Sequence, residues 1–515
     1  MKINLRKDLP RWLTLLALLA FFIIAARGME TDDWVITLLR GLSVGSVTFL
    51  VASGFSLIFG LLDVLNMAHG TLFMLGAYIS WTVYVRPDTF VDLLTPVLLL
   101  LSGFTLTAIW KKLANKIKQK RNWLAIVRWA GLAVGIAVLV IIFPQYPISS
   151  WDVGNYSQSP VTYSYLADQG LINLPVGLPF DGISPIVAVL GLLVSGLLIA
   201  FSLSTFDSRT QGGSKITWKD MTAFVILVAL GVVTLIFNDP LTAFLTGLDT
   251  TWLFLFAIIV GVMVGVVLGI VMEATLIRPL YDRPIYQLML TLGLSAMGIE
   301  AVRAIWGRPE FVMPKPSLFA GTGDGCPATS FADLINNQCS TILLFDSRIR
   351  VYNEIFIPLV GILVLVAIWI LLQRSRLGMI IRAGVQDREM VEALGINVQR
   401  VFNTVFALGV GLAVLGGGLA APSMGLSNTM GETLTLNALI AMAIGGLTYY
   451  PGAALGSLLV GLMQQVIIKY GAIGIPIPFT DIVFKPTPPL VPASTVLLMV
   501  IVLLILPNGL LGRKE

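Results

Sequence analysis

The chain has 515 residues, of which 57% are hydrophobic and 12% are charged, and its formal net charge is +5. Soluble globular domains carry about 25% charged residues, so the composition excludes an ordinary soluble domain. The basic excess does not indicate nucleic-acid binding, because basic residues in membrane proteins mark the cytoplasmic loops. Apolar runs of about 20 residues recur along the chain, which predicts an all-α polytopic protein embedded in a lipid bilayer.

Roughly fourteen transmembrane or re-entrant segments are predicted by the length criterion. In chain order they lie near 12–26, 34–60, 69–84, 91–109, 123–143, 183–205, 221–238, 251–275, 285–305, 352–373, 401–421, 433–449, 453–470 and 488–506. The first follows a basic start and lacks a clear small-residue cleavage site, so we expect a retained signal anchor. Several segments are short or interrupted by glycine, and some of these are expected to be re-entrant.

The charges of the loops predict that both termini lie in the cytoplasm. The N-terminal segment 1–12 and the loops 111–123, 207–219 and 374–400 are basic, and an even number of spans places all of them on one side. The loop 144–182 contains no Lys or Arg and falls on the other side. This distribution follows the positive-inside rule.

The loop 307–351 is also expected outside, and it holds the only two cysteines, Cys326 and Cys339. An outward loop of a bacterial inner membrane meets an oxidising compartment. Because both cysteines share one such loop, we expect a disulfide between them, with two unpaired thiols as the alternative.

The cytoplasmic segment 374–400 differs from its surroundings because it is rich in charge and yet has an apolar stripe. We expect a short helix from near Asp387 to Gly395, since glycine commonly follows the last residue of a helix. Met390, Val391 and Leu394 form the stripe at helical spacing. A solvated loop explains the charges but not the stripe, so a helix that docks into a groove of a soluble partner is the preferred interpretation.

The sequence contains no pattern typical of an enzyme. It has no GxxxxGK[ST] phosphate-binding loop and no His/Cys/carboxylate cluster with metal-ligand spacing. Its single histidine lies in an apolar segment, which argues against a Ser/His/Asp hydrolase. We therefore expect no catalytic residues, no cofactor and no metal, and any ATP hydrolysis would require another chain.

The stretch RSRLGMIIRAGVQDREMVEALGINVQRVFNTVFALG at 374–409 resembles the cytoplasmic loop of permease subunits of branched-chain amino acid (LIV-type) ABC transporters, and its EALG at 392–395 resembles the coupling motif of ABC import permeases. Similar blocks lie at 41–78, 277–302, 441–462 and 503–515. The resemblance assigns ATPase coupling to Arg382, Gln386, Asp387, Glu389, Glu392, Ala393 and Gly395.

The resemblance implies a transport subunit of the bacterial inner membrane with no enzymatic chemistry of its own. Two permease subunits, identical or homologous, would form the pathway for branched-chain or related amino acids. Cytoplasmic ABC ATPase subunits would bind the coupling loops, and a periplasmic substrate-binding protein would deliver the substrate.

The resemblance covers roughly 1–84 and 251–515, which predicts three parts of the chain. Residues 1–84 form the first part of the permease core. Residues 85–250 form an inserted membrane segment with extra spans and an external loop. Residues 251–515 form the rest of the core, with the external loop 307–351 and the coupling loop 374–400.

Polar residues interrupt the apolar stretch 61–78, where Asp63, Asn66 and His69 are followed by Gly70. On a continuing helix their spacing of three would place the three polar side chains on one face. Polar groups inside a bilayer usually face a cavity, a partner or an interface. Two interpretations stay open: the residues line the pathway or its inner gate, or they cap helix ends and tie a bend to a neighbouring helix.

A second break is expected at 445–456, where Gly445, Gly446, Pro451 and Gly452 interrupt an apolar run. Broken helices in corresponding halves of a transporter often mark the pathway between them. The two stretches share only a loose pattern, which weakly favours an internal repeat.

Three other functions are alternatives to the amino acid importer. The same family includes importers of urea and short amides, and no residue here excludes that substrate class. An ion-coupled secondary transporter depends on intramembrane acidic or histidine residues, for which Asp63 and His69 are the candidates. The coupling-like helix argues against it. A scaffold without transport activity is disfavoured by the glycine-rich, broken helices.

Overall fold

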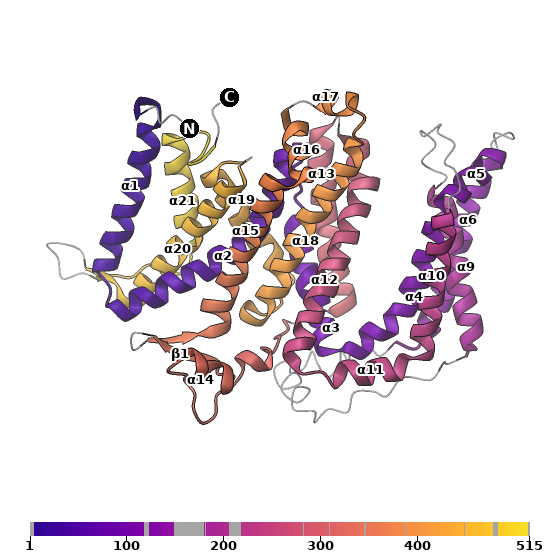
Figure 1. The fold of residues 1–515 in the computed structure, drawn as a ribbon, viewed down its shortest axis with the longest axis horizontal. Coiled ribbons are helices and arrows are strands. Elements are labelled where there is room, and N and C mark those ends of the chain that lie inside the picture. Colours follow the sequence, from indigo (N-terminus) through magenta and orange to yellow (C-terminus); the bar gives the residue numbers. More distant parts are fainter. Residues whose placement is uncertain are drawn as a thin grey trace. The chain divides into compact units, whose positions relative to one another are not determined.

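The computed structural model describes residues 5–117, 123–148, 180, 182–204, 218–281, 283–307, 310–344, 347–386, 388–447, 449–476 and 483–512. Regular structure in these ranges is almost entirely helical, as Figure 1 shows, with two short antiparallel hairpins. This confirms the predicted all-α polytopic architecture. Asp387 and most of the predicted loop 144–182 lie outside the described residues.

The chain forms two compact units, Met1–Trp81 with Thr250–Glu515 and, separately, Thr82–Asp249. The boundaries at 84/85 and 250/251 separate the predicted family core from the predicted insertion. That division stays a prediction.

The first unit is built around long apolar helices. Its elements are α1 (Leu5–Arg27), α2 (Thr31–Leu62), most of α3 (His69–Val85), α12 (Thr250–Met272), η2 (Glu273–Ile277), η3 (Arg278–Leu280), α13 (Pro284–Trp306), η4 (Ser317–Phe319), α14 (Phe331–Asn336), β1 (Thr341–Leu344), β2 (Ser347–Arg350), η5 (Val351–Phe356), α15 (Ile357–Arg374), α16 (Arg376–Gln386), α17 (Arg388–Ala393), α18 (Val398–Met424), α19 (Met430–Gly445), α20 (Tyr450–Ile473), β3 (Ile475–Pro476), β4 (Val483–Phe484) and α21 (Leu490–Ile505).

The second unit is a smaller helical bundle. Its elements are α4 (Pro87–Thr105), α5 (Thr107–Ile117), α6 (Trp123–Ile142), η1 (Phe143–Gln145), α9 (Pro185–Ser204), α10 (Trp218–Ile236) and α11 (Asn238–Thr246). Two buried hydroxyl contacts join its helices: Ser195 donates to the Gly135 carbonyl at 2.8 Å, and the Thr95 and Thr234 hydroxyls lie 2.9 Å apart.

Ten described helices are long and apolar enough to cross a membrane, and eleven if the bent pair α10–α11 is counted as one span. The other predicted spans correspond to shorter elements, namely the 17-residue α3 and the 16-residue α19 and α21. A full crossing needs about 20 residues, so these three helices are shorter than a standard span, as the sequence indicated for re-entrant segments.

Within the first unit, two groups of elements lie at opposite ends. Figure 1 shows that α1 begins and α21 ends at the end where α17 lies, whereas β1 and α14 lie at the opposite end. The positive-inside rule predicts that the end with α17 is cytoplasmic.

Helix α2 packs against α20 and α18 where glycines remove side chains from the contact. A Cβ placed on Gly461 of α20 would lie 2.8 Å from the Gly45 Cα of α2. A Cβ placed on Gly409 of α18 would lie 2.9 Å from the Gly54 carbonyl oxygen of α2. Small residues let helix backbones approach closely in lipid, where no hydrophobic force draws helices together.

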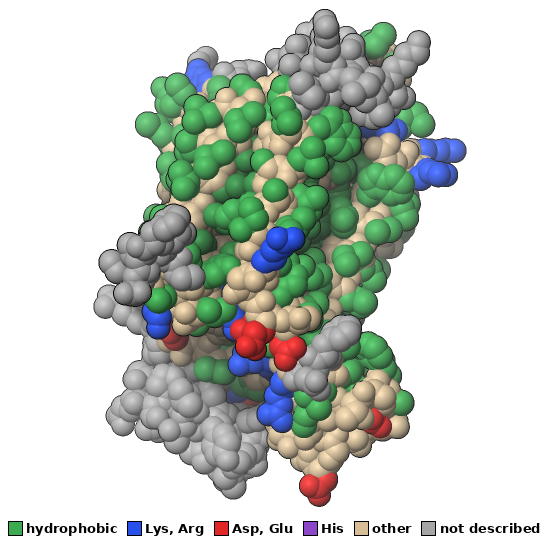
Figure 2. Space-filling view, turned by 90° about the vertical axis from the view of Figure 1, so that its left-hand side faces the viewer, with side chains coloured by type: hydrophobic (Ala, Val, Ile, Leu, Met, Phe, Trp, Pro, Cys, Tyr) green, Lys and Arg blue, Asp and Glu red, His purple; other side chains and the backbone are tan. Residues whose placement is uncertain are grey.

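The outer surface of the first unit is suited to lipid. On α1 the side chains of Trp12, Leu16 and Ile24 are 54%, 58% and 70% exposed. Figure 2 shows hydrophobic side chains over most of one face of the molecule, with acidic side chains in its lower half and Lys and Arg side chains towards both ends. A broad apolar belt between charged margins is what a bilayer-spanning surface requires.

The segment between α13 and η5 is ordered by a hairpin and a disulfide. Strand β1 pairs antiparallel with β2, with Ile342 opposite Ile349. Cys326 and Cys339 are joined, and their Cα atoms lie 5.5 Å apart.

The short helix α14 in the same segment has a polar N-terminal cap. The Ser330 hydroxyl accepts from the Asp333 N–H at 3.1 Å, and the Thr329 hydroxyl donates to the Asp333 carboxylate at 2.8 Å. These contacts with Ser330 and Thr329 hold the pKa of the exposed Asp333 carboxyl below its ordinary value.

A methyl group at the α2–α20 crossing should destabilise the protein. Gly461→Ala forces the two backbones apart, and overpacking of this kind costs about 1–3 kcal/mol. The matched control is Gly293→Ala on α13, because a Cβ there meets nothing within 4 Å. Thermal unfolding in detergent should show a lower midpoint for Gly461→Ala only, and equal midpoints for the two variants would contradict the crossing.

The pairing of the two cysteines can be counted directly. Since the chain has two cysteines, maleimide should add no label to the denatured, unreduced protein and two labels after reduction, as read by intact mass. Cys326→Ser should take one label without reduction. Two labels on the unreduced wild-type protein would show that the bond does not form in cells.

Candidate functional site

The predicted coupling segment forms two short helices at one end of the first unit. Helix α17 (Arg388–Ala393) ends in a tight turn, in which the Gly395 N–H donates to the Glu392 carbonyl at 2.9 Å. Gly395 has φ +78°, a left-handed conformation that glycine adopts without strain. The Asn397 side chain then accepts from the Arg400 N–H at 3.1 Å and caps the start of α18.

The predicted coupling residues are distributed over this segment as follows. Arg382 on α16 is exposed, and its guanidinium donates to the Gln373 side chain at 2.6 Å. Glu392, Ala393 and Gly395 are exposed. Gln386 ends α16 and Glu389 lies in α17, but their side chains, like the whole of Asp387, lie outside the described part of the chain.

The apolar stripe of α17 divides into an inner and an outer part. Val391 is only 3% exposed and packs into the protein, whereas Met390 and Leu394 are 64% and 74% exposed. The two exposed side chains are four residues apart and therefore lie on one face of the turn. Large apolar groups presented together at a surface are typical of an interaction site.

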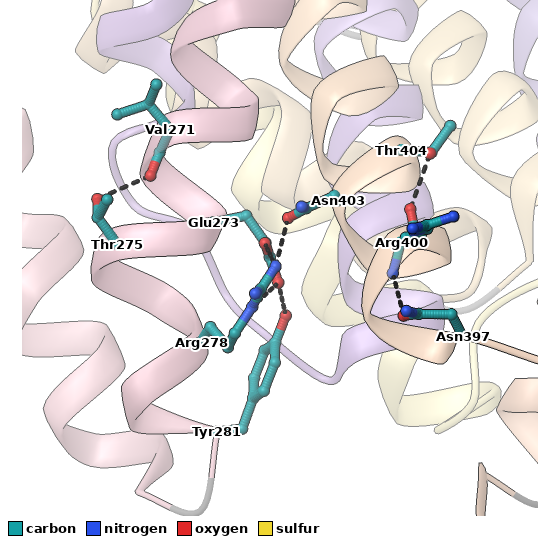
Figure 3. A network of polar contacts seen from close by, with 9 residues as sticks. All are labelled: Val271, Glu273, Thr275, Arg278, Tyr281, Asn397, Arg400, Asn403 and Thr404. Carbon is teal, nitrogen blue, oxygen red and sulfur yellow. Dashed lines mark hydrogen bonds and ion pairs between the residues drawn. The ribbon is translucent and has the colours of Figure 1, made fainter. Parts of the chain in front are cut away.

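A buried polar network lies beside the start of α18 (Figure 3). The Glu273 carboxylate is fully buried; it accepts from the Arg278 guanidinium at 2.8 Å and from the Tyr281 hydroxyl at 2.6 Å. Arg278 also donates to the Asn403 side chain at 3.0 Å. The charge of Glu273 is thus paired and hydrogen-bonded, as a buried charge requires.

This network connects two segments that are distant in sequence. Glu273 begins the π-helical turn η2 after α12, and Asn403 lies in α18 shortly after the coupling segment. The Tyr281 ring also packs edge-on against Phe402, with centroids 5.7 Å apart. The network therefore holds the start of α18 against the end of α12.

The sequence does not identify Tyr281 and Asn403 as the partners of Glu273 and Arg278. Nothing in local spacing indicates that residues 278 and 403 meet, because 125 positions separate them. A usable signal was the carboxylate of Glu273 at the end of a strongly apolar run, since a buried charge demands a partner.

The first polar break lies between α2 and α3. Asp63 ends α2 in a left-handed conformation with φ 53°, and its N–H donates to the Phe59 carbonyl at 2.9 Å. The Asn66 side chain accepts from the Ala68 N–H at 3.1 Å, just ahead of α3. Asp63 thus ends one helix and Asn66 precedes the start of the next, which is the geometry of the capping interpretation.

The three polar side chains of this break do not share one face. Residues 63–66 are not helical, and Asp63 is exposed whereas Asn66 and His69 are fully buried. The His69 ring packs against Phe55 with centroids 4.3 Å apart. Gly70 contacts the α19 backbone, because a Cβ on it would clash with the Gly431 carbonyl.

The second break lies between α19 and α20. Gly445 and Gly452 contact each other through their backbones, so a Cβ on either would clash with the other. Gly446 follows α19 with φ +114°, and Pro451 lies in the first turn of α20. The Gly445 carbonyl also accepts from the Leu511 N–H at 3.0 Å, which fixes the segment after α21 to this break.

Comparison with known proteins gives a consistent result. The family model described as the permease component of the branched-chain amino acid transport system matches residues 221–507. The blocks at 277–302, 374–409 and 441–462, from which the resemblance was inferred, lie inside this range. The match begins within α10, in the second unit.

Individual relatives agree with the family match. The high-affinity branched-chain amino acid transport system permease protein LivH of Salmonella typhimurium is 26% identical over 272 residues, which are 52% of this chain and 78% of the relative. LivH of Escherichia coli K12 is 27% identical over 272 residues, which are likewise 52% of this chain and 78% of the relative. BraD of Pseudomonas aeruginosa is 32% identical over 165 residues, which are 32% of this chain and 49% of the relative. No solved structure matches.

Removal of the buried charge should loosen the start of α18. Glu273→Gln weakens the bonds to Arg278 and Tyr281, and hydrogen bonds to charged groups contribute about 1.5–3 kcal/mol each. The matched control is Glu300→Gln, whose carboxylate is 68% exposed and pairs with Arg303 on one helix face; such pairs contribute at most about 1 kcal/mol. Hydrogen exchange measured over 398–410 should accelerate for Glu273→Gln and not for Glu300→Gln.

Proposed function

Because the chain belongs to the family of branched-chain amino acid transport permeases, we propose that it is the membrane subunit of an ATP-driven importer and forms the translocation pathway for branched-chain amino acids. The family membership makes it a multi-pass transport subunit of the inner membrane rather than an enzyme. The energy source, the direction of transport and the partners are the proposed part.

The exposed face of α17 is the observation that supports ATP coupling. Met390 and Leu394 present apolar side chains together on one face, and Glu392, two residues from each, is exposed on another side of the same short helix. A short helix with an exposed apolar pair and an exposed carboxylate matches a partner groove that is apolar at its base and basic at its rim. We propose that a cytoplasmic ABC ATPase subunit occupies this face.

The position of α17 explains how such docking would act on the membrane helices. Val391 anchors α17 to the core, and only Gly395 and Ile396 separate Leu394 from the cap residue Asn397 of α18. Because this link is short, α17 and α18 would move together, and movement of the ATPase would therefore shift α18. The Glu273 network holds the start of α18 and determines how far it can shift relative to α12.

The names of the relatives support a substrate class. LivH and BraD carry branched-chain amino acid transport in their names, and we propose the same substrate class for this chain. A binding protein would dock at the end of the first unit that carries β1, β2 and α14, which is opposite to α17 in Figure 1. A second permease subunit would complete the pathway.

Variants of α17 test the coupling proposal. Glu392→Arg reverses a charge at the docking face, and Leu394→Asp buries a carboxylate in the apolar contact; each should abolish co-purification of the ATPase with the tagged chain in detergent. The matched control is Asp324→Arg, an equally exposed residue in the segment that carries the disulfide. It should retain the ATPase.

Two outcomes would contradict the proposal. Retention of the ATPase by both α17 variants would show that α17 is not its docking element. Uptake of leucine by the chain alone, driven by an ion gradient without ATP, would assign the protein to the secondary transporters instead.

A further inference from the structure

The first unit contains a cavity of about 440 Å³. It lies between α2, α18, α19, α20 and the turn η5. Its volume falls within the range of about 300–1,000 Å³ that is usual for small-molecule sites. All of its lining residues belong to the first unit.

Two opposite charges form one wall of this cavity. The Arg40 guanidinium on α2 donates through Nε to the Glu354 carboxylate at 2.9 Å. The second carboxylate oxygen accepts from the Arg350 N–H at 2.7 Å. The Glu354 side chain is only 2% exposed, whereas the Arg40 side chain is 48% exposed. The pair thus combines a fixed anion with a more accessible cation.

Both members of the pair retain hydrogen-bonding capacity. A guanidinium has five N–H donors, and the bond through Nε uses one of them. Its remaining planar donors match a carboxylate in two parallel bonds. Each carboxylate oxygen of Glu354 has a second lone pair, which suits an ammonium group. One wall therefore offers partners to a carboxylate and to an ammonium group at the same time.

Positive charge is also concentrated around Glu354 from other elements. Arg350 lines the cavity, and Lys315 lies in the field of Arg350 and Glu354. Burial, and after it the charge of Arg350, lowers the pKa of Lys315 below its ordinary value, although Glu354 opposes the shift. The local excess of cations favours ligands that carry a carboxylate.

The remaining walls are uncharged. Asn353 accepts from the Ser423 hydroxyl at 2.9 Å, and Asn437 accepts from the Gln464 amide at 3.3 Å. Val44 and Val47 of α2, with Leu434 of α19, supply branched aliphatic surface. The site thus has a charged wall, an amide and hydroxyl rim, and an aliphatic wall.

We propose that this cavity binds a zwitterionic α-amino acid with an aliphatic side chain during its passage through the permease. Arg40 holds the α-carboxylate, Glu354 holds the α-ammonium group, and the aliphatic wall receives the side chain. This rests on the proposed function and specifies it, because uncharged urea, amides and sugars would gain only hydrogen bonds, and no charge pairing, from Arg40 and Glu354.

The position of the cavity fits an outward-facing site. Ser423 and Met424 line it from the last turn of α18, whereas α18 begins beside the coupling segment. At about 1.5 Å of rise per residue, the 25 residues from Val398 to Ser423 span about 37 Å. The cavity is therefore at the far end of the helix that the coupling segment would move.

Direct binding to the purified chain tests this site apart from energy coupling. The full-length chain in lipid nanodiscs, without ATPase or binding protein, is titrated with radiolabelled L-leucine. Unlabelled leucinamide lacks the carboxylate, 4-methylpentanoate lacks the ammonium group, and D-fructose has neither. We expect leucine to bind saturably, the first two analogues to compete at least about tenfold more weakly, and fructose not to compete.

Variants then assign the contacts. Arg40→Gln removes the partner of the ligand carboxylate and should weaken leucine binding at least about tenfold. Arg40→Lys keeps the charge but not the planar donors, so its affinity for leucine should lie between those of Arg40→Gln and wild type. The matched control is Arg348→Gln on β2, an exposed arginine outside the cavity, which should bind as wild type does. The analogue series on the wild-type chain decides the question if a variant fails to fold.

The outcomes separate this proposal from the proposed function. Failure of leucine to bind, competition by 4-methylpentanoate as strong as by leucine, or unchanged binding by Arg40→Gln would overturn the cavity as a zwitterion site. None of these results depends on ATP. If the wild-type chain bound leucine but did not co-purify with the ATPase, the importer proposal would fail and the cavity would stay in place as a zwitterion site.

Discussion

The close backbone contact between α2 and α20 is the constraint on which the rest of the first unit depends. In lipid, helices gain little from burying apolar side chains, so association relies on close van der Waals contact. Gly41 and Gly45 of α2 meet Gly461 of α20 at this crossing. Arg40 precedes Gly41 by one residue, and Gln464 follows Gly461 by three, less than one helical turn. The same contact that packs the two helices therefore also brings two polar residues into the wall of the cavity.

Helix α18 connects the two ends of the unit. Its 27 residues run without a break from the cap residue Asn397 to Gly425, and its buried face contains several glycines that admit α2, α3 and α12. Near its start, Asn403 is held by Arg278 of the buried Glu273 network. At its other end, Ser423 and Met424 reach the cavity. A shift of α17 would therefore move α18 as a whole and reach the proposed substrate site. The Glu273 network near the start of α18 would limit that movement.

The sequence predicted the number and order of the helices well, because a bilayer crossing imposes a long apolar run that is visible locally. It also located the short helix α17 and the chain breaks at Asp63 and Gly446, since left-handed or glycine-dependent turns leave a local signature. It could not predict that Val391 is buried while Met390 and Leu394 are exposed, because that depends on the neighbouring core. Nor could it predict the Arg40–Glu354 pair, whose members are 314 positions apart and meet only through the packing of α2 against η5.

The most direct test of the whole account is uptake of radiolabelled L-leucine into proteoliposomes that contain this chain, its permease partner and the ATPase, with the binding protein outside. The account predicts accumulation that requires ATP in the lumen and is unaffected when ion gradients are collapsed. Uptake that persists without ATP and disappears with the ion gradient would contradict it.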